Sequence, residues 1–395
     1  MRGNSWICGP LAVALCALGG CGEDGGSEPA TGLVMPGQPG VQPTDDGTAE
    51  PSAGAAGAPA PAVGDDTADP AGEMPQVPSG DDDEPAAGAD PGPMAADDMT
   101  PDAFDYAGES VPLDTDLVVA AGETLRVGPG ASFMASAGVT VVVDGTLLIE
   151  GSADAPVRFM GAGVPRSWEG IVVSGGGHLE ASHVEIGGAT YGIHALPGST
   201  FTVQDADIGT SFKAAVVQSD GSFDRVAFHA SGDPTFSISS AAPITDPNGT
   251  LTIVDGSPTV TNSSFDSGAP LVDMVRVRGS SAAVFDHVYI TDAHCGIHME
   301  GGPNNSPTVT NSIFDGMAYG VMAYATKPII EDSIFMNNAS DVGFCVGATA
   351  DNVPQLSNNY YSSGAPLFDP SCVQIGTTDA APAAAPNPDA GPIGL

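Results

Sequence analysis

Basic side chains are scarce in this sequence. Its 395 residues include 9 Lys and Arg against 49 Asp and Glu, which gives a formal net charge of −40 at pH 7. Binding to nucleic acid or to an anionic membrane through a basic surface is excluded, because neutralising phosphates requires clustered cations. Gly and Pro are abundant instead, at 53 and 35 residues, and such enrichment is typical of disorder or of many turns.

The first twenty residues have the features of an export signal. One cation, Arg2, precedes an apolar stretch that is too short to span a membrane. The stretch ends in "LGGC", residues 18–21, which resembles the lipobox of bacterial lipoproteins and implies cleavage before Cys21 and diacylation of its sulfur. An ordinary secretory signal with an incidental cysteine is the alternative. We expect an exported protein that a lipid on Cys21 anchors to the bacterial cell envelope, at the outer membrane or cell surface.

The segment 21–105 has the composition of a linker. It consists largely of Gly, Pro, Ala, Ser and acidic residues, and no Lys or Arg occurs between Arg2 and Arg126. A chain with so few aromatic and β-branched residues cannot bury enough apolar surface to offset the entropy lost on ordering. The sequence therefore predicts a signal peptide at 1–20, a disordered acidic linker at 21–105, a folded domain at 106–375 and a similar disordered tail at 376–395.

The central part of the chain is an internal repeat. Units such as "HLEASHVEIGGATYGIHA" and "PTVTNSIFDGMAYGVMA" recur at steps of about 20 to 26 residues. One longer step contains "AAPITDPNGTLTI", which indicates an inserted loop or hairpin around residues 239–254. Aligning the central apolar residue of each unit gives Ile186, Ile208, Phe228, Phe265, Ile290, Phe314, Phe335 and Tyr361.

Each unit holds three short β-rich runs separated by Gly, Asn or Asp, and none has a helical period. Three strands that pair with their equivalents one coil away form a parallel β-helix. The segment "GVTVVVDGTLLIEGSADAPVRFMG" with the following "RSWEGIVV" resembles right-handed parallel β-helix proteins of the pectate-lyase-like superfamily. The predicted fold is all-β, a single right-handed parallel β-helix solenoid of about eleven coils.

The stretch "DAHCGIHM", residues 292–299, places two histidines beside a cysteine. Regular strand alternation would turn Cys295 inward with Ile297, as a buried and inert thiol, and His294 and His298 outward. The two histidines would lie about 13 Å apart along the strand, too far to share one metal ion. We therefore predict no metal site here.

Two other residue sets have structural explanations. Cys345 and Cys372 are one coil plus a few residues apart and are predicted to form a disulfide at the C-terminal end, with two free thiols as the alternative. Stacked Asn and Asp side chains are expected to form a turn ladder, in which amides separate the carboxylates. Calcium bound by outward carboxylates is the open alternative, although no cofactor is expected. The ladder residues are Asp224, Asn262, Asp286, Asn311, Asp332 and Asn358, with Asp205 in the same alignment.

No substrate is indicated by the sequence. We expect a non-catalytic binding or structural and adhesion module, for polysaccharide or for another surface protein. Exposed aromatics that could line a groove are few, with Tyr289, Tyr324 and Tyr360 as candidates. The alternative is a polysaccharide lyase or glycoside hydrolase that acts on an acidic polysaccharide, because a dense group of ionisable residues could bind a sugar acid. This group consists of Asp273, Arg276, Arg278 and His298.

Overall fold

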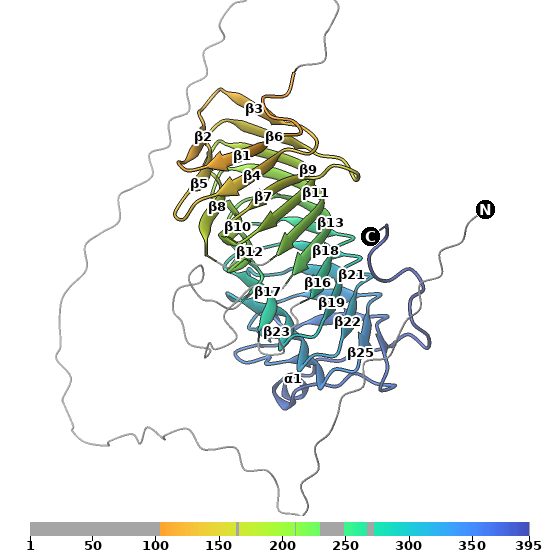
Figure 1. Cartoon of the computed structure of the whole chain (residues 1–395). Helices are drawn as coiled ribbons and strands as arrows, with labels where there is room; N and C mark the ends of the chain where they lie inside the picture. The colour runs from red at the N-terminus through yellow and green to blue at the C-terminus, as the bar shows by residue number, and fades with distance from the viewer. Residues whose placement is uncertain (1–102, 163–165, 210, 230–248, 267–271, 395) are drawn as a thin grey trace, which may run out of the picture. The chain divides into compact units, whose positions relative to one another are not determined.

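A computed structural model describes residues 103–162, 166–209, 211–229, 249–266 and 272–394. Parallel strands stack turn upon turn through these residues and form a β-solenoid, as the sequence predicts (Figure 1). One face is a ten-stranded sheet whose neighbouring strands lie one turn apart along the chain. Its strands are β2 (Leu117–Val119), β5 (Thr140–Val143), β8 (Trp168–Val173), β10 (Ala189–Ala195), β12 (Lys213–Val217), β14 (Leu251–Val254), β17 (Asp273–Arg278), β20 (Cys295–Glu300), β23 (Tyr319–Tyr324) and β26 (Ser340–Gly343).

The other strands belong to an eighteen-stranded sheet that is made of two adjoining columns. Three long strands run through both columns: β9 (His178–Gly187), β11 (Thr200–Gly209) and β13 (Gly221–His229). The first column also contains β3 (Thr124–Val127), β6 (Thr146–Glu150), β15 (Thr259–Thr261), β18 (Val284–Asp286), β21 (Thr308–Thr310), β24 (Ile329–Glu331) and β27 (Gln355–Ser357). The second contains β1 (Ser110–Leu113), β4 (Ser132–Ala135), β7 (Val157–Met160), β16 (Ser264–Asp266), β19 (Tyr289–Thr291), β22 (Ile313–Asp315), β25 (Ile334–Met336) and β28 (Tyr360–Tyr361).

The predicted repeat register is confirmed residue by residue. Each aligned apolar residue is the direct partner of its counterpart in the next turn, from Ile186 with Ile208 to Phe335 with Tyr361. Because equivalent side chains stack at the spacing of neighbouring strands, aromatic rings lie face to face. The ring centroids of Phe314 and Phe335 are 4.9 Å apart, with planes 7° apart.

The solenoid has about nine turns rather than the predicted eleven, since the ten strands of the first sheet are separated by nine parallel steps in the described part of the chain. One step, from Ala215 to its partner Leu251, takes 36 positions. After Cys345 the described residues add no further strand to this sheet, because β27 and β28 belong to the larger sheet and are followed by a short helix. Dividing the length of the domain by the repeat length therefore overcounts the turns.

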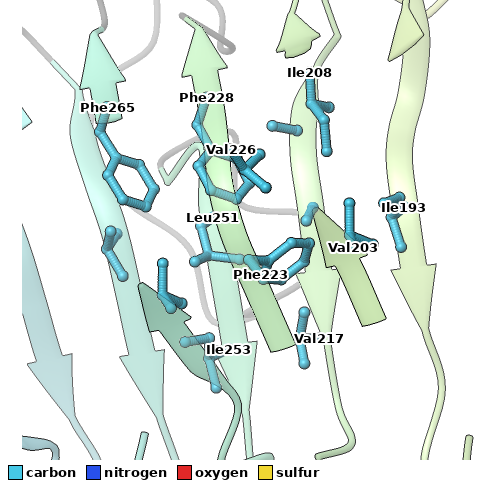
Figure 2. Packing of buried hydrophobic residues seen from close by; sticks show 14 of the residues in the cluster. Ile193, Val203, Ile208, Val217, Phe223, Val226, Phe228, Leu251, Ile253 and Phe265 are labelled. Atoms are coloured by element: carbon cyan, nitrogen blue, oxygen red, sulfur yellow. The ribbon is translucent and has the colours of Figure 1, made fainter. Parts of the chain in front are cut away.

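The interior between the sheets is apolar. Figure 2 shows Val203, Phe223 and Phe228 of the larger sheet in the same buried cluster as Val217 and Ile253 of the ten-stranded sheet. All five side chains are buried. Strands such as β5 and β6 bury alternate residues on this side, and the stacking of turns makes one continuous core.

The turn ladder exists, but two of its predicted members are displaced by one residue. One residue per turn, between the two columns of the larger sheet, adopts a left-handed backbone, with φ between 47° and 55°. Asp224 and Asp286 each precede that position, which Arg225 and His287 occupy. Their carboxylates instead accept hydrogen bonds from the next turn, as Asp286 does from Thr310 Oγ1 at 2.7 Å and Asn311 Nδ2 at 2.8 Å. The left-handed residues are His183, Asp205, Arg225, Asn262, His287, Asn311, Asp332 and Asn358.

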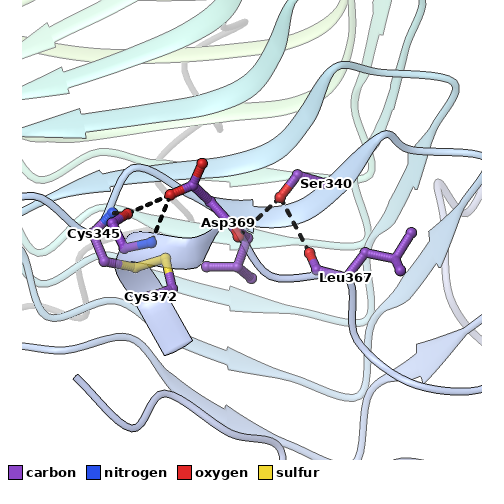
Figure 3. The surroundings of a disulfide bond; sticks show 7 residues. Ser340, Cys345, Leu367, Asp369 and Cys372 are labelled. Atoms are coloured by element: carbon purple, nitrogen blue, oxygen red, sulfur yellow. Dashed lines mark hydrogen bonds between the residues drawn. A yellow bond between two sulfur atoms is a disulfide. The ribbon is translucent and has the colours of Figure 1, made fainter. Parts of the chain in front are cut away.

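The C-terminal end of the solenoid is closed by a disulfide between Cys345 and Cys372, the pair that the sequence predicts (Figure 3). Cys372 lies on the short helix α1 (Pro370–Gln374), and Asp369 caps that helix by accepting a hydrogen bond from Ser371 N. The preceding segment is held by Ser340 Oγ, which donates to Leu367 O at 3.2 Å. These contacts protect the last turn, which has no neighbour to stack on it.

The predicted disorder of residues 376–395 is wrong for the described residues 376–394. Asp379 forms a parallel bridge with Leu356, and Gly391 N donates to Asn311 O at 2.8 Å. Composition does not predict this order, because the segment lacks the apolar residues that usually hold a chain in place.

The predicted signal at 1–20, the lipidation site Cys21 and almost all of the linker 21–105 lie outside the described residues, as does most of the predicted insert. The one helix among the described residues, α1, has five residues, and no helix there is long and apolar enough to cross a bilayer.

Replacing Phe314 tests whether the stacked core holds the turns together. Phe314→Ala leaves a cavity under Phe335, and we expect a loss of about 3–5 kcal/mol in unfolding free energy. Urea denaturation followed by circular dichroism measures the change. Met134→Ala, at a site that is 51% exposed, is the control and should change the midpoint little. Equal midpoints for the two variants would contradict the packing described.

Candidate functional site

The outer face of the ten-stranded sheet is polar and aromatic between β12 and β26. Strand alternation is broken here, because two consecutive residues of β17, Met274 and Val275, both belong to the core. Alternation resumes after them, with Val277 inward. Asp273, before the inward pair, therefore lies on the outer side together with Arg276 and the following alternate residues.

The predicted inward direction of Cys295 is wrong for the same reason. Cys295 pairs in register with Asp273, and a Cβ added to the next residue, Gly296, would lie 2.9 Å from the core ring of Phe314. The thiol is a free, fully buried cysteine outside the core cluster, and burial followed by the nearby Asp273 charge raises its pKa well above the ordinary value. The prediction of a buried, unreactive thiol is consistent with this placement.

The carboxylate of Asp273 is hydrogen-bonded to both histidines of the "DAHCGIHM" stretch. Its side chain is 2% exposed, with Oδ2 2.7 Å from His298 Nδ1 and Oδ1 3.1 Å from His294 Nδ1. Burial alone would raise the pKa of Asp273, but the two histidines and Arg276 outweigh it and hold this pKa well below its usual range. The sequence placed Cys295 and the histidines on opposite sides of the sheet, whereas the structure gathers them on one side around Asp273.

Glu300 joins the two arginines to the same group. Its Oε1 lies 2.7 Å from Arg276 Nη2, and its Oε2 lies 2.7 Å from Arg278 Nη2. His298 Nε2 is 2.9 Å from Oε1. Burial opposes ionisation of Glu300, yet His298 and the two arginines together lower its pKa to about 2. Glu300 is thus an anion shared by three cationic or potentially cationic side chains.

The protonation of His298 depends on these two carboxylates. Its side chain is 8% exposed, and burial by itself lowers its pKa. The hydrogen bond to Asp273 and the proximity of Glu300 outweigh burial, so the pKa of His298 is raised above 6.5. Each ring nitrogen lies within 2.9 Å of a carboxylate oxygen, and the negative charge of the two carboxylates stabilises the protonated ring.

Three aromatic rings border this network. Phe344 lies between Tyr319 and Tyr324, with ring centroids 4.8 Å and 5.9 Å away, and Tyr324 stacks on His298 at 5.2 Å. Tyr319 contacts His294 at 5.5 Å. The three rings are half-buried and keep part of their surface in water. We call Tyr319, Tyr324 and Phe344 the aromatic cluster.

The structure therefore brings together all four residues that the sequence nominated: Asp273, Arg276, Arg278 and His298. Of the three aromatics that the sequence nominated, Tyr324 lies beside them, whereas Tyr289 and Tyr360 belong to the larger sheet. Sequence reasoning missed Glu300, Tyr319 and Phe344. The repeat alignment contained a signal for Glu300, because it is the in-register partner of Arg278.

The charges of the turn ladder do not gather around a metal position. Asp205 is paired with Arg225 at 2.6 Å, and Asp286 is paired with His287 at 2.8 Å. Within the described residues, no group of three or more His, Cys, Asp or Glu side chains is placed to hold a metal ion.

Comparison with models of known protein families gives a match. A family model described as "Right handed beta helix region" matches residues 169–380, which is 212 of the 395 residues. No curated protein and no solved structure matches the chain.

Substitution of His298 should remove a pH-dependent part of the stability. Because its folded pKa is raised above 6.5, this stabilisation is fully present below the unfolded pKa and is lost as pH rises through the folded pKa. We expect His298→Gln to lower the urea midpoint more at pH 5.5 than at pH 9.

The matched control is His178→Gln, whose side chain is 39% exposed. Comparing each variant with the wild type at both pH values cancels the contributions of all other groups. A His298→Gln deficit that is the same at the two pH values would show that the histidine is not held as an ion between Asp273 and Glu300.

Proposed function

This chain belongs to the right-handed β-helix family, and from that premise we propose that it is a non-catalytic binding module of the bacterial cell envelope that contacts glycans through the outer face of its ten-stranded sheet. A lipid on Cys21 would anchor it, and the acidic segment 21–105 would hold the solenoid away from the membrane. Like charges and proline extend such a segment.

The aromatic cluster is the observation that carries this proposal. Tyr319, Phe344 and Tyr324 place three half-buried rings in contact on a sheet face. The faces of aromatic rings carry negative potential and attract the polarised C–H bonds of a sugar ring. A few polar groups next to apolar rings are typical of small-molecule sites, and Arg278 and His294 supply them here, with side chains that are 15% and 26% exposed.

The charge state of the neighbouring network favours a neutral glycan. Arg276 and Arg278 both lie 2.7 Å from Glu300, so binding a sugar carboxylate would require an acidic ligand to compete with an internal carboxylate. Such competition costs the desolvation of the ligand without adding a new cation. The hydroxyl groups of a neutral sugar need no such exchange.

The same network argues against the catalytic alternative, an acidic-polysaccharide lyase or hydrolase. A general base must reach a proton of the substrate, and each ring nitrogen of His298 already faces a carboxylate within 2.9 Å. A hydrolase needs one carboxyl group with a raised pKa as the acid. The pKa values of both Asp273 and Glu300 are lowered.

The test is a retention and turnover screen with the full-length chain. The protein is passed over immobilised neutral and acidic polysaccharides with and without calcium, and soluble reducing or unsaturated ends are measured in parallel. We expect retention on at least one neutral polymer without turnover. Tyr319→Ala combined with Tyr324→Ala should reduce retention at least tenfold, since each ring supplies on the order of 1 kcal/mol.

Tyr360→Ala, on the other sheet, is the matched control and should retain binding. Thermal unfolding of each variant separates a lost contact from a lost fold. Turnover that Arg278→Ala abolishes would establish the lyase or hydrolase instead. Calcium-dependent retention that is unchanged in the double variant would show that the binding site lies outside the aromatic cluster. Absence of both retention and turnover across the panel would overturn the proposal.

A further inference from the structure

The C-terminal segment crosses the turns of the solenoid along the turn ladder. It begins at the last turn, where Asp379 Oδ2 accepts hydrogen bonds from Asn359 N at 3.2 Å and Asn359 Nδ2 at 3.1 Å. Ala383 N then donates to Asn359 O at 3.0 Å. The blue end of the chain in Figure 1 follows this edge past β25 and β22 toward β21.

Asn387 is the main contact in the middle of this segment. Its Nδ2 donates to Asn311 Oδ1 and to Asp332 O, both at 3.0 Å. The two acceptors belong to the left-handed ladder positions of neighbouring turns. One amide group therefore joins two turns that are 76 and 55 residues away from it in sequence.

The end of the segment fits close to the ladder. Gly391 N donates to Asn311 O at 2.8 Å, with a φ of 94° that residues other than glycine rarely adopt. Farther along, Gly394 approaches the Arg225 side chain and lines a cavity of about 340 Å³ beside it. The contacts thus run from the turn of Asn359 to that of Arg225.

We infer that the turn ladder is a peptide-binding groove and that residues 382–394 of the same chain are its occupant, an intramolecular strap. Backbone and amide groups of the ladder bind the strap, and Asn387 and Gly391 give the groove its selectivity. Turns of a solenoid otherwise contact only their neighbours. A strap that spans several turns resists their separation from the C-terminal end, independently of any glycan bound to the opposite sheet.

Binding in trans provides the test. A chain that ends at Ala381 keeps the Asp379 contacts but lacks the strap, and a fluorescent peptide of residues 382–394 is titrated into it. We expect saturable binding to the shortened chain and at least tenfold weaker binding to the full-length chain, whose groove is occupied. The peptide with Asn387→Ala should bind roughly tenfold more weakly, because it loses two hydrogen bonds. The peptide with Ala385→Ser, at an exposed position, is the control.

Hydrogen exchange on the full-length chain keeps the inference testable if the shortened chain does not fold. The amides of Ala383 and Gly391 should exchange slowly, because they donate to Asn359 O and Asn311 O, and Asn387→Ala should remove the protection of Gly391. Fast exchange of Gly391 in the unaltered chain would overturn the strap, as would a folded shortened chain that does not bind the peptide. If the protein elutes as a dimer on size exclusion and each C-terminal segment protects the ladder of the other copy, the strap is exchanged between two chains and the intramolecular strap is overturned.

Discussion

The hydrogen-bonded register between successive turns is the constraint on which the rest of the structure depends. Each residue lies beside its equivalent one turn away, as Phe265 lies between Phe228 and Ile290. A backbone conformation required at one turn is consequently required at the next, which explains the left-handed residue repeated at the turn between the two columns. Hydrogen bonds from Asn311 to Asp286 and from Asn358 to Asp332 follow from the same register. Core stacking and the ladder are two results of one geometric rule.

The same register between turns determines which parts of the structure could be predicted from the sequence alone. The apolar column was predictable to the residue, because a local pattern repeated many times fixes its own alignment. The direction of Cys295 was not predictable from alternation, because Gly296 and Ile297 both turn toward the core and shift the parity of the strand. Within a single turn, the sequence of a strand with two consecutive inward residues looks like that of a regularly alternating strand. The pair can be recognised only because other turns repeat it, as Met274–Val275 and Ala214–Ala215 do.

The order of the C-terminal segment depends on a partner that composition does not reveal. Residues 382–394 contain no core side chain, and their sequence resembles the linker. Their hydrogen bonds go instead to carbonyl and amide groups at or beside the ladder, such as Asn359 O and Asn311 Oδ1. A segment that cannot form a core of its own can still be ordered by a surface that supplies its hydrogen-bond partners. Proline reduces the number of donors that the surface must satisfy, and the strap contains prolines at 382, 386, 388 and 392.

Scarce cations and the repeat geometry together shape the surface. Arg126 pairs with Glu150 at 2.8 Å, Arg158 with Glu185 at 2.7 Å, and Arg225 with Asp205 at 2.6 Å. In each pair the partners are about one turn apart in sequence, as they are for Arg276 and Arg278 with Glu300. These arginines therefore join turns to one another, and the surplus acids remain to give the chain its net charge of −40. A field of this sign repels polyanions over about one Debye length, roughly 8 Å at physiological salt. An uncharged polymer does not have to overcome that field. The net charge of the chain and the paired arginines beside the aromatic cluster therefore both favour a neutral ligand.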